Sequence, residues 1–297
     1  MSENTNENVN GGEFEDQNGF EEDCTHDCSS CGVNCPSRNA VNSFLAEQNE
    51  FSDIKKIIGV VSGKGGVGKS LVTGLLASET RRRGLETGVL DADITGPSIP
   101  HLFGVKEKAT GTESMLFPAS SKNGVKLMSI NLLLQNEDDP VVWRGPVIAG
   151  VIKQFYSEVA WGKTDVLFVD MPPGTGDSPL TVFQSLPLDG IVIVTSPQDL
   201  VSMIVRKAVN MAEMMNIPVL GLVENMAYYD CPDCGKRHYI FGESHAEEIA
   251  ARYNVPAVAQ LPIDPAFAEF SDAGKISEYE TKALDPILDR ILNTPEA

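Results

Sequence analysis

Positive charge is scarce in this chain of 297 residues, in which 23 Lys and Arg stand against 42 Asp and Glu, a formal net charge of −19. So acidic a protein is not expected to bind nucleic acid, because phosphate backbones attract basic surfaces. No run of about 18 uninterrupted apolar residues exists, which predicts no membrane span. The first residues, MSENTNENVN, contain no basic or apolar stretch, so no secretory signal is expected. We therefore expect a cytoplasmic protein with neither a membrane nor a nucleic-acid partner.

The chain changes character after its first forty residues. Residues 1–40 hold nine acidic residues and one basic residue, a net charge of −8, and cannot bury a core. We predict a flexible acidic arm there, a linker over 41–54 and one globular domain over 55–295. Polar-flanked apolar segments at about 110–140 predict an inserted hairpin or loop rather than a second domain.

Short apolar runs alternate with helix-like stretches throughout the predicted domain. Leu71–Arg83 and Val201–Met215 have the character of crossover helices, and the apolar spacing over 284–292 predicts a helix packed on the core. The predicted strands are Ile57–Val61, Gly88–Leu90, Val166–Val169, Gly190–Thr195 and Val219–Val223. Runs that are apolar throughout are typical of strands buried on both faces of a parallel sheet. The expected fold class is α/β, a doubly wound and mostly parallel sheet.

A glycine-rich segment follows the first predicted strand and opens the first predicted helix. It reads Gly63, Lys64, Gly65, Gly66, Val67, Gly68, Lys69, Ser70 and matches G-x-x-x-x-G-K-[ST]. Glycines let successive backbone N–H groups turn toward phosphate oxygens, and the helix N-terminus adds partial positive charge. Lys69 can reach the β- and γ-phosphates, and the Ser70 hydroxyl can bind Mg²⁺. We predict that residues Gly63 to Leu71 hold the phosphates of ATP.

Polar side chains stand where three of the predicted strands end. Ligands of doubly wound sheets bind at the carboxyl ends of the strands, so these side chains should face the glycine-rich loop. We predict that Asp170 holds Mg²⁺ through water, that Asp93 positions the attacking water and that Asp91 lies nearer the metal. Asn225 offers both an acceptor and a donor, which suits adenine. Lys69, Asp93 and Asp170 are thus candidate catalytic residues.

The six cysteines form two groups, which in a reducing compartment favours metal or cluster binding over disulfides. Cys231 and Cys234 form a C-x-x-C with His238 nearby, a spacing that also suits a zinc knuckle. The other four cysteines offer enough thiolates for one [4Fe–4S] cluster or one zinc ion. They are Cys24, Cys28, Cys31 and Cys35.

Lys64 gives the loop the pattern K-G-G-x-G-K-[ST], which resembles the deviant Walker A motif. Its family of dimerising P-loop ATPases includes MinD, ParA-type partition proteins and the nitrogenase iron protein. The resemblance implies a homodimer in which Lys64 reaches the partner's nucleotide and takes part in hydrolysis. It also implies that Asn225 contacts the base.

Further motifs resemble the Mrp/ApbC group of iron–sulfur cluster carrier ATPases over about residues 55–290. They are Asp91–Pro100, Asp170–Asp177, Asn225-Met226 and Cys231-Pro-Asp-Cys234. The resemblance implies slow ATP hydrolysis and a [4Fe–4S] cluster bridged by Cys231 and Cys234 of both subunits, for transfer to apo-proteins. The four N-terminal cysteines resemble the cluster motif of the cytosolic scaffold members, with different spacing.

Two alternatives stay open. A positioning ATPase of the MinD/ParA kind would be expected to have a basic or membrane-binding surface, and it would have no need of a C-x-x-C. A P-loop ATPase whose cysteines hold only structural zinc would fit the spacing of Cys231 and Cys234 alone.

Overall fold

The computed structural model describes residues 45–94, 96, 98–112, 115–134, 145–197 and 201–294. By its internal contacts the chain divides into Met1–Ser43 and Phe44–Ala297, and the described residues lie in the second unit. The predicted arm and the four N-terminal cysteines therefore lie outside the described residues.

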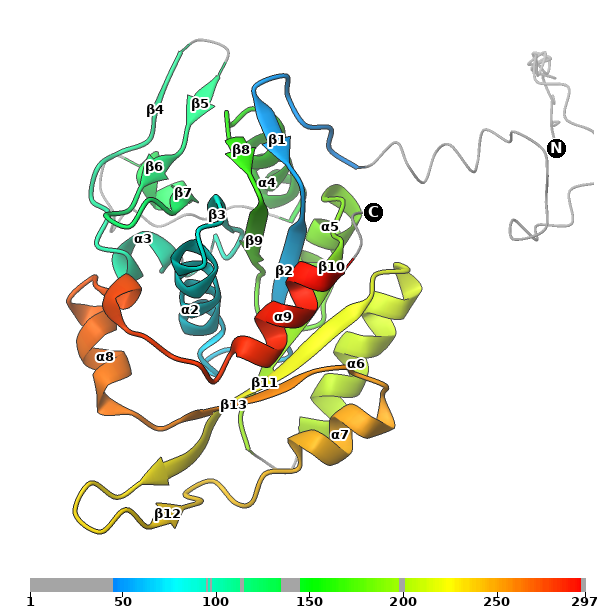
Figure 1. The fold of residues 1–297 in the computed structure, drawn as a ribbon. Helices are drawn as coiled ribbons and strands as arrows, with labels where there is room; N and C mark the ends of the chain where they lie inside the picture. Colours follow the sequence, from blue (N-terminus) through cyan, green and yellow to red (C-terminus); the bar gives the residue numbers. More distant parts are fainter. Residues whose placement is uncertain are drawn as a thin grey trace, which may run out of the picture. The chain divides into compact units, whose positions relative to one another are not determined.

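The core of the second unit is a nine-stranded sheet in the order β12-β11-β10-β2-β9-β3-β7-β6, with β13 also paired to β11. Within this nine-stranded sheet, only the β6–β7 and β11–β12 pairs are antiparallel. The predicted α/β class, with a doubly wound and mostly parallel sheet, is confirmed (Figure 1). The strands are β2 (Ile57–Ser62), β3 (Thr87–Asp91), β6 (Ala119–Ser120), β7 (Lys126–Met128), β9 (Val166–Asp170), β10 (Gly190–Thr195), β11 (Val219–Asp230), β12 (Arg237–His238) and β13 (Val258–Pro262).

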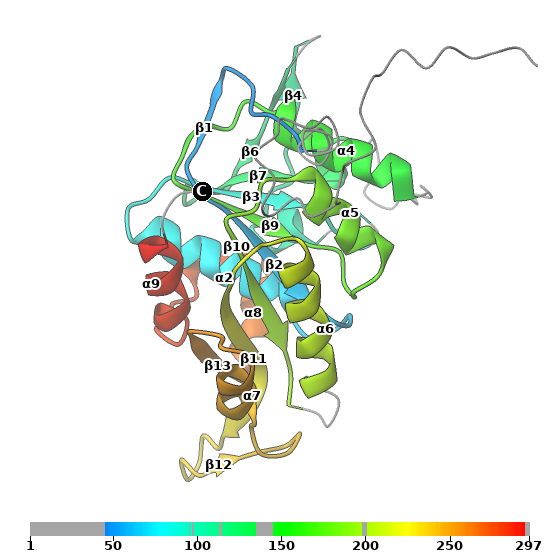
Figure 2. The same ribbon diagram turned by 90° about the vertical axis from the view of Figure 1, so that its right-hand side faces the viewer.

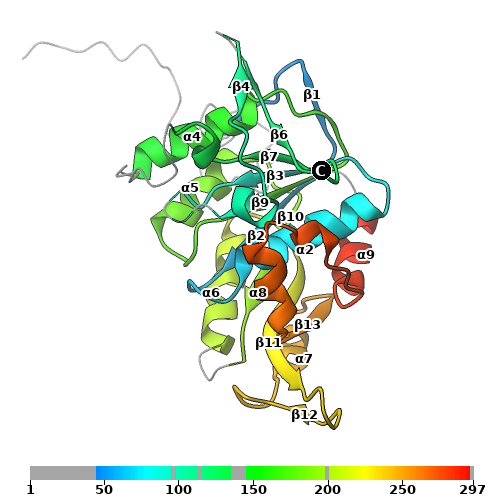
Figure 3. The same cartoon turned by 90° about the vertical axis from the view of Figure 1, so that its left-hand side faces the viewer.

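Helices cover both faces of this sheet, as Figures 2 and 3 show from opposite sides. One face carries α2 (Lys69–Arg82), α3 (Ile99–Leu102), α8 (Pro265–Asp272), α9 (Asp285–Asn293) and the short 3-10 helix η2 (Ile276–Glu278). The other face carries α4 (Gly145–Ser157), α5 (Asp177–Ser185), α6 (Val201–Met214) and α7 (Ala246–Arg252). Apolar side chains therefore fill a separate core layer on each side of the sheet.

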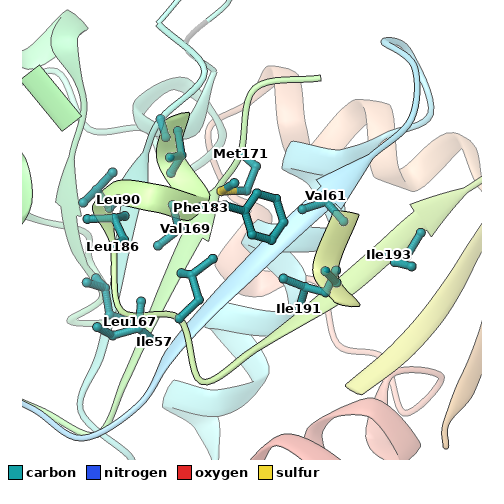
Figure 4. Packing of buried hydrophobic residues seen from close by; sticks show 14 of the residues in the cluster. Ile57, Val61, Leu90, Leu167, Val169, Met171, Phe183, Leu186, Ile191 and Ile193 are labelled. Carbon is teal, nitrogen blue, oxygen red and sulfur yellow. The ribbon is translucent and has the colours of Figure 1, made fainter. Parts of the chain in front are cut away.

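The central strands are buried along their whole length, which explains why they contain β-branched residues on both faces. Figure 4 shows part of the layer beneath α5, where the ring of Phe183 lies by Met171 and Val61. Burying a side chain of this size contributes about 1.5–3 kcal/mol. This packing fixes the strand ends, and with them every group that projects from those ends.

Shorter elements lie around the sheet. β1 (Ser52–Ile54) pairs in parallel with β8 (Gly162–Thr164), and β4 (Thr110–Gly111) forms a small hairpin with β5 (Leu116–Phe117). The next hairpin, β6–β7, joins the main sheet through β3, and the 3-10 helix η1 (Ile130–Leu132) follows it. Within the described ranges, no helix is long and apolar enough to cross a bilayer.

The end of the C-terminal helix is held by hydrogen bonds from one buried lysine, Lys56. Lys56 Nζ donates to the carbonyls of Ile291, Leu292 and Thr294 at 3.2, 2.8 and 2.6 Å. These are orphan carbonyls at the end of α9, where a cation is favoured. The helix predicted over 284–292 packs on the sheet, because Ile287 and Leu288 are fully buried.

Strand β11 continues past the predicted end at Val223 to Asp230. Its register against β13 shifts between Glu224 and Tyr228, and Met226 has a φ of 59°. This irregularity lets the strand leave the buried sheet and extend as an antiparallel hairpin with β12, whose polar residues lack the apolar pattern of a core strand.

Candidate nucleotide site and cysteine hairpin

The glycine-rich loop joins β2 to α2 at the carboxyl end of the sheet. Gly66 and Gly68 have φ values of 79° and 84°, in the left-handed region that favours glycine. A Cβ on Gly68 would lie 2.2 Å from Asn225 Nδ2, and one on Gly63 would lie 2.0 Å from a methyl of Ile204 in α6. The loop is thus closely confined by β11 on one side and α6 on the other.

Lys69 and Asp170 meet at the centre of the site. Lys69 Nζ lies 2.7 Å from Asp170 Oδ1 and 3.6 Å from Asp93 Oδ2. Asp170 ends β9 and is fully buried, while Lys69 opens α2 and is 6% exposed. A buried cation is tolerable only beside such carboxylates. The fold therefore places the loop lysine against both of the predicted catalytic carboxylates.

Two hydroxyls of α2 complete the surroundings of Asp170. Ser70 Oγ donates to Asp170 Oδ2 at 2.6 Å, and Thr73 Oγ1 donates to Asp170 Oδ1 at 2.9 Å. Thr73 was not foreseen from the sequence. The signal that could have found it is its spacing, because residues three and four apart lie on one face of a helix.

Asp91 has a different environment from the other two carboxylates. It accepts hydrogen bonds from Ser129 Oγ and from the backbone N–H groups of Asp93 and Ile99, at 3.1, 3.2 and 3.4 Å. Burial, and then the charge of Asp170, raise the pKa of Asp91 well above its usual range. In this arrangement Asp91 holds the segment that carries Asp93, and its predicted place near a metal stays a prediction.

A cavity of about 260 Å³ opens over the loop. Its wall includes Lys69, Ser70, Asp93 and Pro173, so cation, hydroxyl and carboxylate face the same space. A larger hollow, of about 460 Å³, lies at the opposite end of α2 among arginine side chains. Those arginines already pair with glutamates. The smaller cavity is therefore the better candidate for a phosphate ligand.

Asn225 lies where β11 passes the loop. Its Nδ2 donates to the carbonyl of Val67 at 3.0 Å. Its Oδ1 is buried and has no hydrogen-bond partner among the described residues. Unsatisfied buried acceptors are rare, and this one fits a donor such as the amino group of adenine.

Lys64 lies half-buried at the start of the loop, where its carbonyl accepts a hydrogen bond of 3.0 Å from Ser62 Oγ. Ser62 and Gly65, the residue after Lys64, line the cavity over the loop. Its predicted reach to a partner's nucleotide stays a prediction.

Cys231 and Cys234 lie in the turn between β11 and β12. Figure 1 shows that this hairpin projects beyond the rest of the sheet. Both are free thiols, with Cys231 half-buried and Cys234 exposed. Cys231 N–H donates to the Lys236 carbonyl at 3.0 Å, and Gly235 N–H donates to the Cys231 carbonyl at 2.8 Å. Hydrogen bonds from the backbone of Cys234 and Asp233, and from the Cys234 thiol, lower the pKa of Cys231. A lowered pKa favours the thiolate, the form that binds metals.

Among the described residues, the cysteine pair has no third metal ligand beside it. In the part of the chain that the structure describes, no three His, Cys, Asp or Glu side chains gather as a metal site. A closed zinc site needs four ligands. The pair by itself supplies two of the four ligands that such a site requires.

A parallel sheet with a glycine-rich loop, a buried lysine and an acidic strand end defines a P-loop NTPase. A model of the ParA group described as NUBPL iron-transfer P-loop NTPases matches residues 53–294. The chain belongs to this family.

Individual relatives agree with this assignment. The chain is 45% identical over 260 residues to an iron-sulfur cluster carrier protein of Clostridium perfringens, covering 85% of this chain and 90% of the relative. It is 46% identical to a solved nucleotide-binding protein of Archaeoglobus fulgidus in complex with ADP, with a TM-score of 0.71, covering 82% and 93% of the two chains. The cell division ATPase MinD of Pyrococcus furiosus, 20% identical with a TM-score of 0.53 and coverage of 80% and 97%, shares the fold.

Proposed function

We propose that this protein is an ATP-binding and slowly ATP-hydrolysing carrier or scaffold that holds a [4Fe–4S] cluster and passes it to apo-proteins. The observation that carries the proposal is the course of β11. This one strand contacts the glycine-rich loop through Asn225 and ends at Asp230, directly before Cys231, which lies six residues beyond Asn225. At about 3.3 Å per residue the two sites are at most about 20 Å apart along the strand.

The nucleotide half of the proposal assigns a task to each group around the cavity. Lys69 releases Asp170 and pairs with the phosphates, Asn225 binds the adenine and Asp93 orients the attacking water. Lys64 contributes its charge from the partner subunit. Mg²⁺, held by Ser70 and through water by Asp170, would neutralise charge on the phosphates. Because hydrolysis serves as a switch, slow turnover is sufficient.

The cluster half of the proposal requires a homodimer. Two thiolates per chain leave a [4Fe–4S] cluster half-ligated, and a two-fold axis supplies the other two. Directly after β12, Tyr239, Ile240 and Phe241 are 48%, 60% and 46% exposed. A contiguous exposed apolar segment of this kind suits a protein interface. We propose that a second copy of this chain covers it.

The interface can be tested by Ile240→Asp, which places a charge in the apolar segment. We expect a mainly monomeric protein that has lost its cluster and that hydrolyses ATP more slowly, because the partner's Lys64 no longer reaches the nucleotide. The exposed Glu243→Gln, two residues beyond the segment, is the matched control. Sedimentation with and without ATP measures the oligomeric state. A cluster-loaded dimer of the Ile240→Asp variant would contradict the proposed interface.

The N-terminal cysteines extend the proposal. Cys24, Cys28, Cys31 and Cys35 would ligate a second [4Fe–4S] cluster within each chain. A cytoplasmic location suits this cysteine usage, because thiols stay reduced there.

Metal analysis of anaerobically reconstituted protein tests the function directly. About two iron and two sulfide per chain would correspond to one bridged cluster per dimer, and about six of each would add the N-terminal clusters. Cys231→Ser with Cys234→Ser should remove two iron per chain and leave the rest. Stoichiometric zinc without sulfide would instead support a P-loop ATPase with structural zinc, and would overturn the carrier proposal.

A further inference from the structure

Three side chains form a stack at the base of the cysteine hairpin. Arg237 Nε and one terminal nitrogen donate to the two carboxylate oxygens of Asp230, both at 2.8 Å. The same guanidinium lies over the ring of Tyr228, 3.5 Å from its centroid. We refer to Tyr228, Asp230 and Arg237 as the hairpin clamp.

The clamp ties the returning strand to the last residue held by the sheet. Tyr228 pairs with Pro262 of β13, and its carbonyl accepts a hydrogen bond of 2.6 Å from Ile263. Beyond Tyr228, β11 pairs only with β12. Arg237 reaches back from β12 and binds both Tyr228 and Asp230, so it bridges the anchored and the projecting parts of the hairpin.

Little else restrains the hairpin. β12 is only two residues long, and no residue from 228 to 245, all of them described, belongs to the buried core. Two-stranded hairpins without a core are marginally stable in water. The orientation of the cysteine turn therefore depends on local contacts, of which the clamp is the most specific.

The geometry is also unusually favourable for an exposed ion pair. Side chains that are 46% and 48% exposed usually gain little from pairing, because water and salt screen them. A two-pronged guanidinium–carboxylate contact stacked on an aromatic ring is the exception, since each contact orients the other. Lysine cannot replace this arrangement, because its ammonium group lacks the planar fork.

We propose that Arg237 is a positioning residue, which holds Cys231 and Cys234 in the orientation that retains the cluster and so limits the rate of cluster release. This rests on the proposed carrier function. Preorganised ligands bind more tightly than mobile ones, because less conformational freedom is lost on binding. Opening the clamp would loosen both thiolates together.

The test uses full-length protein in which the four N-terminal cysteines are serine, so that Cys231 and Cys234 are the only thiols. Phenylarsine oxide, which binds paired thiols, reports their spacing without any cluster. The rate at which a ferrous-iron chelator bleaches the reconstituted cluster reports its retention. Arg237→Gln should weaken arsenical binding and speed cluster loss, each by about tenfold.

Two matched variants sharpen the test. Lys236→Gln removes the same charge from the adjacent residue. It should behave as the parent, because the hydrogen bond from Cys231 goes to the backbone carbonyl of residue 236. Arg237→Lys keeps the charge without the fork and should fall between the two. All variants should bind ATP equally, because the clamp lies outside the nucleotide site.

The outcomes separate the clamp from the function. Equal behaviour of Arg237→Gln and Lys236→Gln in both assays would overturn the proposed positioning role of Arg237. A parent that binds no sulfide, combined with weakened arsenical binding by Arg237→Gln, would overturn the carrier function and support the clamp. Faster cluster loss with weakened arsenical binding would support both.

Discussion

The nucleotide site and the cysteine hairpin share strand β11, yet they are held in opposite ways. Around the glycine-rich loop, Lys69, Asp170 and Asn225 are almost completely buried and are fixed by helices on both faces of the sheet. Around the cysteines, the side chains are half-buried or exposed and depend on the turn and the hairpin clamp.

One chain thus combines a rigid site with an adaptable one. Phosphate chemistry needs charges preorganised at fixed positions, which a close-packed core supplies. A site that must accept and release a bulky cargo needs access, and weakly supported elements open at low cost in free energy. Four substitution experiments sharpen or break this contrast.

Asp170→Asn should have the largest effect. It removes the carboxylate that binds Lys69, Ser70 and Thr73, and we expect ATP hydrolysis to fall by about 100-fold or more. Asp165→Asn, just before the other end of the same strand, is the control and should leave turnover unchanged. Turnover is measured as phosphate release. Near-normal turnover of Asp170→Asn would show that the buried group of Lys69, Ser70, Thr73 and Asp170 is not the catalytic centre.

Gly68→Ala should destabilise the fold itself. Alanine at a φ of 84° is strained, and its Cβ would meet the buried Asn225. We expect a loss of about 2–4 kcal/mol in the free energy of unfolding. Gly65→Ala, whose Cβ would meet nothing within 4 Å, should cost under about 1 kcal/mol. Urea unfolding without nucleotide measures both, and equal losses would contradict a tightly confined loop.

Glu224→Gln should give a smaller effect that depends on pH. Burial raises the pKa of Glu224, against hydrogen bonds from Ser244 and Gln260. Stability that the protonated carboxyl contributes is present below the usual glutamate pKa and is lost as pH rises through the raised value. The glutamine variant avoids this loss. The difference between its melting temperature and that of the wild type should therefore shift by a few degrees in favour of the variant as pH rises from 4 to 8. The exposed Glu243→Gln should show a constant difference, and a constant difference for Glu224→Gln would contradict the prediction.

Cys231→Ser with Cys234→Ser should change stability least. Because the hairpin adds nothing to the core, we expect the free energy of unfolding to shift by under about 0.5 kcal/mol. Urea unfolding of the protein as purified measures it. A collapse of the fold would break the comparison, since it would mean that the cysteines hold a structural metal.

Much of the fold follows from local sequence. Apolar runs without alternation identify strands covered on both faces, and the glycine pattern between Ile57–Val61 and Leu71–Arg83 identifies the phosphate loop, because backbone geometry there admits few other residues. Strands with weaker signals were missed. β13 alternates buried and half-buried residues at the sheet edge, and β11 beyond Val223 continues with the buried polar residues Glu224 and Asn225, which interrupt its apolar run.

By itself, the sequence determined the fold class, the loop and the chemical types at the strand ends, since these depend on short-range pattern and backbone conformation. Only the tertiary structure decided which groups meet. Thr73 joins Asp170, Asp91 is engaged by Ser129, and Arg237 folds back on Tyr228. These contacts depend on how helices and strands pack, and a side chain's direction is set by that packing rather than by its neighbours in sequence.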